Sequence, residues 1–334
     1  MKHLSLLVSF LLTANLLAAG EVRLYTQRHY SADQAVLKRF TDETGIEVKV
    51  VKAGANELIE RIKAEQQAPQ ADLFWTVDAG TLDRAAEAGL FAPVESETLS
   101  SRIPEGLASE EGLWWPVTMR ARVFAVAKDR VENAPQTYLD LANPEWKGRL
   151  LIRSSSSAYN QSLLAALIDA HGKPEAQTWA EKTAGNLARP PQGGDRDQIR
   201  AVALGLGDIA LTNTYYLGLL ETSDDPADRK ARAAVEVVLP DLKGRGTHVN
   251  VSGAGVVKGA ANTAEAIQLL EFLTSPEIQS LYQTLTSEYA VTQGVEREPL
   301  QTVWGELLPD TTSLHKLVDY QEEAVRLFDM AGWP

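Results

Sequence analysis

The spacing of hydrophobic residues along the chain predicts strands and helices in alternation. Residues 22–25 are typical of a short strand, and residues 46–50 alternate apolar and charged side chains as a half-buried strand does. Between them, Ser31 and Gln34 have the spacing of a capping box at the start of a helix. The alternation continues along the chain, which implies an α/β fold with parallel strands and right-handed crossovers.

Two extended segments interrupt this alternation. Residues 117–127 and 249–257 are rich in β-branched and small side chains, which favour strands. Between them lies a second series, with strands predicted at 149–152 and 209–212 and helices at 157–170 and 195–204. The chain of 334 residues, 44% of them hydrophobic, is long enough for two cores. We therefore expect two domains joined by the two extended segments as crossing strands.

The first 20 residues have the three parts of a secretory signal peptide. Lys2 precedes an apolar stretch over residues 4–12, and Ala18-Ala19-Gly20 supplies small residues for cleavage after Gly20. The chain has no cysteine, which excludes disulfides, thiolate metal sites and a lipid-modified N-terminal cysteine. An exported protein without a lipid anchor needs an outer barrier to retain it, so we expect the periplasm of a Gram-negative cell.

Charge excludes some partners. Once Lys2 is removed, 31 basic and 45 acidic residues leave a net charge of −14. Such an excess argues against nucleic acid and anionic membrane surfaces as partners. It is compatible with a cationic ligand, although acidic surfaces are common on exported proteins.

Tyrosines follow three of the predicted strands. Tyr215 and Tyr216 come after residues 209–212, Tyr159 after residues 149–152 and a serine run, and the pair His29 and Tyr30 after residues 22–25. Open α/β sheets bind ligands outside the carboxyl ends of their strands. Phenolate is a hard oxygen donor suited to a hard cation, and a neutral imidazole can bind a metal through one nitrogen. These tyrosines and the histidine predict a site for Fe(III).

Each of these features also has an ordinary interpretation. Tyr215 and Tyr216 could be one core and one surface aromatic, since helix neighbours point about 100° apart. His29 could lie in a solvated loop, and Tyr159 could pack beneath a helix that a serine caps. The common position of all three groups after a strand favours the metal site.

Two arginines and a serine run add further candidates. Arg120 and Arg122 are two residues apart and share a face of a strand; they could form structural ion pairs, orient a phenolate or bind a small anion. Ser155 lies in the serine run, which could also hold a nucleophile. No G-x-S-x-G or S-x-x-K pattern accompanies the run, so a serine hydrolase is disfavoured.

At these residues the chain closely resembles the periplasmic ferric-ion-binding proteins of ABC-type iron uptake. The matching stretches span nearly the whole mature chain: 25–30 (YTQRHY), 118–122 (TMRAR), 153–161 (RSSSSAYNQ), 207–216 (GDIALTNTYY), 288–291 (EYAV) and 331–333 (AGW). The most specific match is the tyrosine pair combined with Tyr159, His29 and Tyr30.

The resemblance implies the two-lobed "Venus flytrap" fold of type II solute-binding proteins, each lobe a doubly wound sheet. It implies a signal peptide over residues 1–20, an N-terminal lobe over 21–118 and 247–290, and a C-terminal lobe over 119–246 and 291–334. His29 and Tyr30 would bind iron from the first lobe. The second lobe would supply Tyr159, Tyr215 and Tyr216, and a synergistic small anion could bind at Arg120, Arg122 or Ser155.

The function that follows is a soluble, monomeric periplasmic receptor that delivers Fe(III) to an inner-membrane ABC permease with its ATPase subunit. Since no bond of the ligand is broken, no enzyme activity is expected. Two alternatives stay open: a receptor for an organic anion or polyamine that stacks on the tyrosines, and a secreted serine hydrolase.

Overall fold

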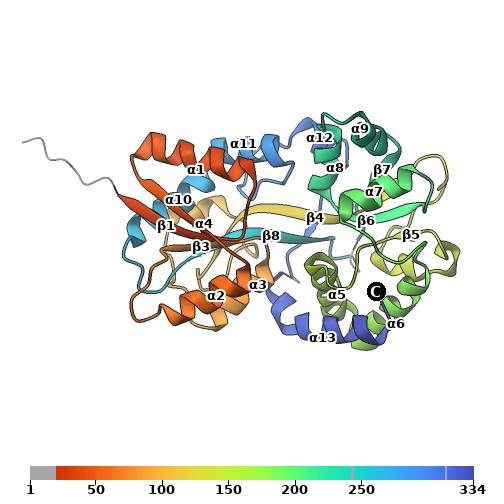
Figure 1. Ribbon diagram of the computed structural model, residues 1–334, viewed down its shortest axis with the longest axis horizontal. Coiled ribbons are helices and arrows are strands. Elements are labelled where there is room, and N and C mark those ends of the chain that lie inside the picture. Colours follow the sequence, from red (N-terminus) through yellow and green to blue (C-terminus); the bar gives the residue numbers. More distant parts are fainter. Residues whose placement is uncertain (1–19, 242–243, 313) are drawn as a thin grey trace, which may run out of the picture.

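Two α/β lobes lie side by side along the long axis of the molecule, and two long strands run between them (Figure 1). The computed structural model describes residues 20–241, 244–312 and 314–334. The predicted signal peptide therefore lies, apart from Gly20, outside the described residues. No helix in the described part of the chain combines the length and apolar composition needed to span a bilayer.

The first lobe is built on three parallel strands. β1 (Glu21–Thr26) lies between β2 (Glu47–Lys52) and β3 (Leu73–Thr76) and pairs with both in parallel. Helices cover both faces of this sheet (Figure 1). They are α1 (Ser31–Thr44), α2 (Ala55–Ala64), α3 (Ala79–Glu87), α4 (Glu97–Arg102), α10 (Thr263–Leu273) and α11 (Pro276–Thr286).

The crossing strands are β4 (Trp115–Ala127) and β8 (Thr247–Val256), and they confirm the two extended segments expected from the sequence. They pair with each other in antiparallel register from Trp115↔Ala254 to Ala121↔Val249. All residues of both strands are buried, as expected of strands covered on both faces.

The second lobe continues the same sheet. β4 pairs in antiparallel with β6 (Ile209–Asn213) and β7 (Val235–Val238), and β6 pairs in parallel with β5 (Leu150–Leu151). Helices again lie on both faces (Figure 1). They are α5 (Ala158–His171), α6 (Lys173–Gly185), α7 (Asp195–Ala203), α8 (Thr214–Glu221) and α9 (Pro226–Ala233).

The expectation of parallel pairing throughout was wrong at the crossing strands. β8 pairs in antiparallel with both β3 and β4, and β4 with β6 and β7. A strand that leaves one lobe and a strand that returns to it run in opposite directions, so their neighbours within each lobe cannot all be parallel.

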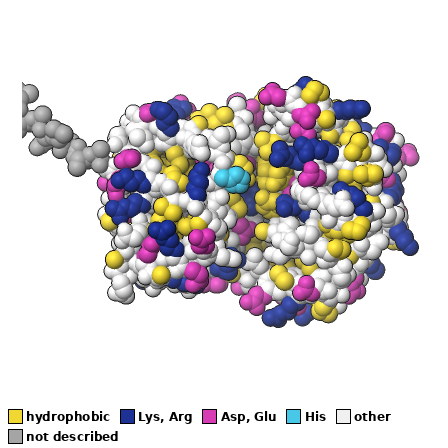
Figure 2. All heavy atoms as spheres, viewed as in Figure 1, with side chains coloured by type: hydrophobic (Ala, Val, Ile, Leu, Met, Phe, Trp, Pro, Cys, Tyr) yellow, Lys and Arg dark blue, Asp and Glu magenta, His cyan; other side chains and the backbone are white. Residues whose placement is uncertain are grey.

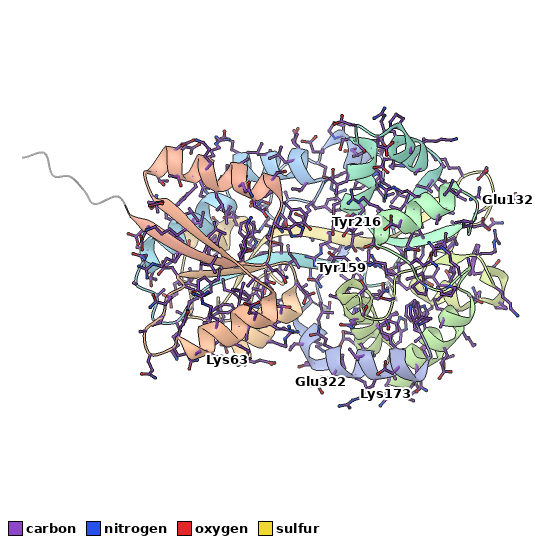
Figure 3. The ribbon with its side chains drawn as sticks, in the orientation of Figure 1. Lys63, Glu132, Tyr159, Lys173, Tyr216 and Glu322 are labelled. Carbon is purple, nitrogen blue, oxygen red and sulfur yellow. The ribbon has the colours of Figure 1, made fainter. Side chains whose placement is uncertain are left out.

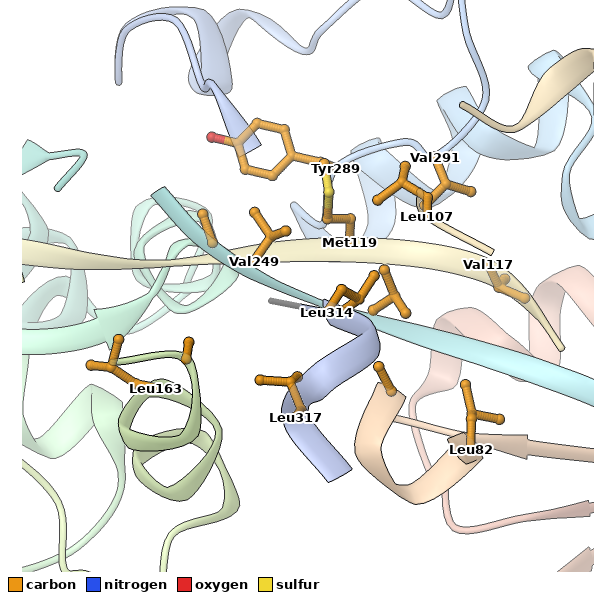
Figure 4. Packing of buried hydrophobic residues seen from close by; sticks show 14 of the residues in the cluster. Leu82, Leu107, Val117, Met119, Leu163, Val249, Tyr289, Val291, Leu314 and Leu317 are labelled. Carbon is orange, nitrogen blue, oxygen red and sulfur yellow. The ribbon is translucent and has the colours of Figure 1, made fainter. Parts of the chain in front are cut away.

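The last part of the chain contacts both lobes. It comprises α12 (Pro299–Thr302), β9 (Pro309–Asp310) and α13 (Leu317–Met330). In α13, Gln321 accepts a hydrogen bond from Arg84 of α3 at 2.5 Å, and Glu323 pairs with Lys173 of α6 at 2.5 Å. Figure 4 shows apolar side chains of α3, α5 and α13 gathered around the crossing strands. Helix α13 therefore bridges the lobes beneath these strands.

A carboxyl group next to this bridge titrates near neutrality. Trp114 Nε1 donates to Asp83 Oδ1 at 2.7 Å, and burial raises the pKa of Asp83 to about 7. The folded protein keeps this proton where the unfolded chain has already lost it. Its contribution to stability is therefore present at pH 4 and is lost as the pH rises through about 7.

We expect Asp83→Asn to stabilise the protein at pH 8 but not at pH 4. Asparagine keeps an acceptor for Trp114 without a charge, so the free energy of unfolding should rise by about 1–3 kcal/mol at pH 8. Urea unfolding at both pH values measures this difference. Glu132→Gln, at an exposed position, is the control and should change neither value. Equal effects of Asp83→Asn at pH 4 and pH 8 would contradict the assignment.

Candidate metal site

The tyrosine pair lies at the carboxyl end of β6. The strand ends at Asn213 and α8 begins directly at Thr214, so Tyr215 and Tyr216 occupy the first turn of the helix. Their ring centroids are 4.1 Å apart. Tyr215 is only 5% exposed, whereas Tyr216 is half-buried. The direct junction of strand and helix holds both rings at the edge of the sheet.

Tyr159 joins the pair from the neighbouring helix. It is the second residue of α5, which follows β5 as α8 follows β6, and these two strands pair in parallel. The two helices therefore begin at the same edge of the sheet. Tyr159 Oη lies 3.1 Å from Tyr215 Oη. Figure 3 shows Tyr159 and Tyr216 near the centre of the molecule, where the lobes face each other.

His29 and Tyr30 lie in the loop between β1 and α1. Their rings stack with centroids 5.1 Å apart. His29 is exposed and Tyr30 is half-buried. Tyr30 and Tyr215 line one pocket of about 100 Å³, together with Leu285 and Glu288. Residues of both lobes thus meet at the tyrosines. On the face seen in Figure 2, a histidine side chain is exposed between the lobes, beside a band of hydrophobic side chains.

Tyr30, Tyr215 and Tyr216 are protonated at neutral pH in the absence of a cation. Burial raises the pKa of Tyr215 well above its ordinary value, and the nearby Tyr159, Tyr216 and Tyr30 raise it further. Burial also raises the pKa of Tyr216, with Tyr159 and then Asp195 adding to the effect. The pKa of Tyr30 is raised by burial, Tyr159 and Glu288, against the opposing charge of Arg28. A bound cation would favour the phenolate form of these side chains.

In the described part of the chain, the other common metal donors do not form a cluster. Among the described residues, no three His, Asp or Glu side chains are placed to hold a metal ion. The chain has no cysteine. The phenol oxygens of this cleft are donors suited to a hard cation, and the carboxylate of Glu288 lines the same pocket.

Arg122 forms a structural ion pair, one of the roles that the sequence left open. Its partner is the buried Asp195, at 2.7 Å, rather than a surface carboxylate. Arg122 also donates to Asn160 at 2.7 Å and to Asn213 at 3.2 Å. Arg153, at 3.2 Å, is a second partner of Asp195. Arg122 thus ties the starts of α5, α7 and α8 together around the tyrosines.

Arg120 has no such partner among the described residues. It is 3% exposed, and its two terminal nitrogens make no hydrogen bond there. They border a cavity of about 10 Å³ whose walls include Tyr159, Ser162 and His248. Burial, with Arg122 and Arg120, lowers the pKa of His248 to about 3, so this ring is neutral. The cavity has room for about one water-sized molecule.

Ser155 lies in the loop before α5 and is half-buried. Its backbone N–H donates to the carbonyl of Pro334 at 3.0 Å, and its carbonyl accepts from Gln161 Nε2 at 3.1 Å. These contacts join the loop to the C-terminal residues and to α5.

Several charged residues around the site were missed from the sequence. Arg28 pairs with Asp33 and Glu288, and Arg153 lies with its Cζ 5.3 Å from the ring centroid of Tyr159. Arg28, Arg153 and Glu288 fall within stretches that carry the family resemblance. However, Glu288 is far from Arg28 in the sequence, and Asp195 is far from Arg153. Asp33 is near Arg28, but no sequence pattern marks the two as a pair.

Comparisons with known proteins agree with one another. The family model described as bacterial extracellular solute-binding protein matches residues 68–302. Iron uptake protein A1 of Synechocystis sp. is 46% identical over 94% of this chain and 87% of its own length. A Trichodesmium protein (IdiA, FutA) solved with iron and citrate ligands is 45% identical, with a TM-score of 0.89 over 94% of this chain and 100% of its own. A ferric binding protein from Campylobacter jejuni is 36% identical, with a TM-score of 0.87 over 94% and 100% of the two chains.

Proposed function

The chain belongs to the family of bacterial extracellular solute-binding proteins, and on that basis we propose that it is a receptor for Fe(III) in ABC-type iron uptake. The observation that carries this proposal is the convergence of four tyrosines, Tyr30, Tyr159, Tyr215 and Tyr216, in one partly buried cleft. Similar proteins that are named for iron uptake or ferric binding support it.

In this proposal the four phenolates and the imidazole of His29 are the protein ligands of the metal. Tyr159 and Tyr215 approach each other within 3.1 Å, so one cation could bridge their oxygens. Iron is the transported ligand here, and no covalent bond of the ligand has to be made or broken. The protein accordingly binds and releases a ligand and has no enzyme activity.

Arg120 would act from outside the first shell of ligands. Its Cζ lies 6.0 Å from the ring centroid of Tyr159, and its terminal nitrogens have no partner among the described residues. A guanidinium at this position could orient the phenolate or hold a small anion beside the metal. Arg122 and Ser155 would contribute less directly, through Asn160 and Gln161 at the start of α5.

The proposed receptor works in the periplasm, as a monomer that passes iron to an inner-membrane permease and its ATPase subunit. Small residues before Glu21, where β1 begins, and the absence of cysteine support export without a lipid anchor. Sequencing the N-terminus of protein released by osmotic shock tests this location. A chain that retained residues before Ala14 would contradict it.

Iron binding is expected to close the two lobes. The ligands come from both lobes, so the metal binds the closed arrangement more tightly than the open one and shifts the population toward it. Small-angle scattering should give a smaller radius of gyration for iron-loaded protein than for iron-free protein. Identical profiles would contradict ligand-driven closure without contradicting binding itself.

The visible absorption spectrum of the protein tests whether it binds Fe(III) through phenolates. Ferric phenolate has an intense charge-transfer band in the visible range, which a bound organic anion or polyamine would not produce. Ferric citrate added to purified iron-free protein should therefore generate a visible band that saturates at one iron per chain. A protein that stays colourless while binding a polyamine or an organic anion would overturn the proposal.

A further inference from the structure

We infer that Arg28 is a positioning residue, which holds Tyr30 in the orientation that the metal needs; this inference rests on the proposed function. Arg28 lies in the loop after β1, two residues before Tyr30. It is not itself a ligand, because a guanidinium has no free lone pair to offer a cation.

The side chain of Arg28 is buried, and each of its guanidinium nitrogens donates a hydrogen bond. It is 2% exposed. Its Nη2 donates to Asp33 Oδ1 at 2.8 Å and its Nε donates to Asp33 Oδ2 at 3.0 Å, an arrangement with two parallel hydrogen bonds. Its Nη1 donates to Ser252 Oγ at 2.8 Å, and Nη2 also lies 3.4 Å from Glu288 Oε2. These contacts fix the plane of the guanidinium.

Two aromatic rings lie against this fixed cation. Its Cζ is 5.0 Å from the ring centroid of Tyr30 and 4.8 Å from that of Trp75. Trp75 is fully buried in β3, and its Nε1 also donates to Ser252 Oγ at 2.8 Å. A planar cation over the faces of two rings orients both, because the attraction is strongest over the ring face. Arg28 thus gives the ring of Tyr30 a rigid neighbour, in addition to the ring of His29 that stacks on it.

Three contacts of Arg28 come from elements that do not carry the other proposed tyrosine ligands. Asp33 belongs to α1, Trp75 to β3 and Ser252 to β8, next to the segment that pairs with β3. Tyr159, Tyr215 and Tyr216 belong to α5 and α8, in the other lobe. Tyr30 is therefore held in its binding orientation before the lobes close, which reduces the ordering that iron must bring about.

The test has to avoid leaving buried carboxylates unpaired. Asp33 and Glu288 are 5% and 6% exposed, so a neutral residue at position 28 would destabilise the fold. Arg28→Lys keeps the positive charge but loses the planar fork and the stacking. Arg61→Lys is the matched control, because Arg61 Cζ lies 4.8 Å from the ring centroid of Tyr25 in the same kind of contact, away from the proposed ligands.

Affinity is measured by iron titration against citrate, and the visible band is recorded for each variant. We expect Arg28→Lys to weaken iron binding about tenfold, in the range for the loss of an outer partner of a metal ligand, and to shift the band. Arg61→Lys should change neither. In a Tyr30→Phe background, Arg28→Lys should cause no further loss, since the ligand that it positions is already gone.

Three results overturn the inference. They are a wild-type affinity and band in Arg28→Lys, an equal loss in Arg61→Lys, and the same loss from Arg28→Lys with and without the Tyr30 hydroxyl. If Arg28→Lys does not fold, Asp33→Asn is used instead, because it weakens the contact with Arg28 while keeping one acceptor oxygen. We expect a smaller loss of iron affinity from Asp33→Asn, and no loss when Tyr30→Phe is already present. A colourless wild-type protein would instead overturn the proposed function, so the two failures are distinguishable.

Discussion

Tyr215→Phe and Tyr216→Phe are each expected to weaken Fe(III) binding by more than about 100-fold, beyond the range for losing an outer partner of a metal ligand. Each change removes one anionic oxygen from the proposed first shell of ligands. The visible band should weaken or shift in both variants. The rings stay in place, 4.1 Å apart in the first turn of α8, so the fold should survive.

Two further variants calibrate this result. Tyr289→Phe removes a hydroxyl that is buried without a hydrogen-bond partner among the described residues, and it should change neither affinity nor colour. His29→Ala should matter less than either phenol, because water or an anion can replace a neutral, exposed ligand. Wild-type affinity and colour in both Tyr215→Phe and Tyr216→Phe would contradict the assignment of these residues as ligands.

Iron affinity is expected to fall steeply as the pH falls. The pKa values of Tyr215, Tyr216 and Tyr30 lie above the ordinary value of a phenol, chiefly because of burial. The iron-free site therefore holds these protons at neutral pH, and each phenolate formed at the metal releases one. Affinity should drop by about tenfold per pH unit for each phenol that ionises, hence by about 1,000-fold or more between pH 7 and pH 6.

Two measurements check this expectation. Mixing iron with protein in weak buffer should release several protons per iron, beyond the release from a blank titration of the iron reagent. The visible band should bleach on mild acidification and return on neutralisation. A band that is indifferent to pH until the protein unfolds would contradict phenolate ligation.

Much of the fold could be predicted because it depends on local pattern. The two-lobed solute-binding fold is confirmed by the matching structures. The crossing segments predicted at 117–127 and 249–257 are β4 and β8, within a few residues, because long runs of β-branched and small side chains are typical of doubly covered strands. The helix predicted at 157–170 is α5, displaced by one residue.

The errors and omissions concern contacts between distant residues. The direction in which β8 pairs with β3 and β4 depends on how the chain returns from the second lobe, which no local pattern records. The partners of Arg28 lie up to 260 positions away, at Glu288. Arg120 and Arg122 share a strand face and look equivalent in sequence. Only the three-dimensional arrangement separates them, since Asp195 reaches Arg122.

The packing of the C-terminal residues has a practical consequence for how the protein is purified. Trp333 is 4% exposed and stacks on Trp179 with centroids 6.0 Å apart, and its Nε1 donates to the carbonyl of Arg153 at 3.1 Å. The Pro334 carbonyl accepts from Ser155 in the same loop, four residues before Tyr159. We expect an affinity tag fused after Pro334 to disturb this loop, because Pro334 is hydrogen-bonded to it, and so to displace Tyr159, a proposed ligand. A tag at the opposite end of the molecule, before Glu21, leaves the loop undisturbed and is the safer choice for metal titrations.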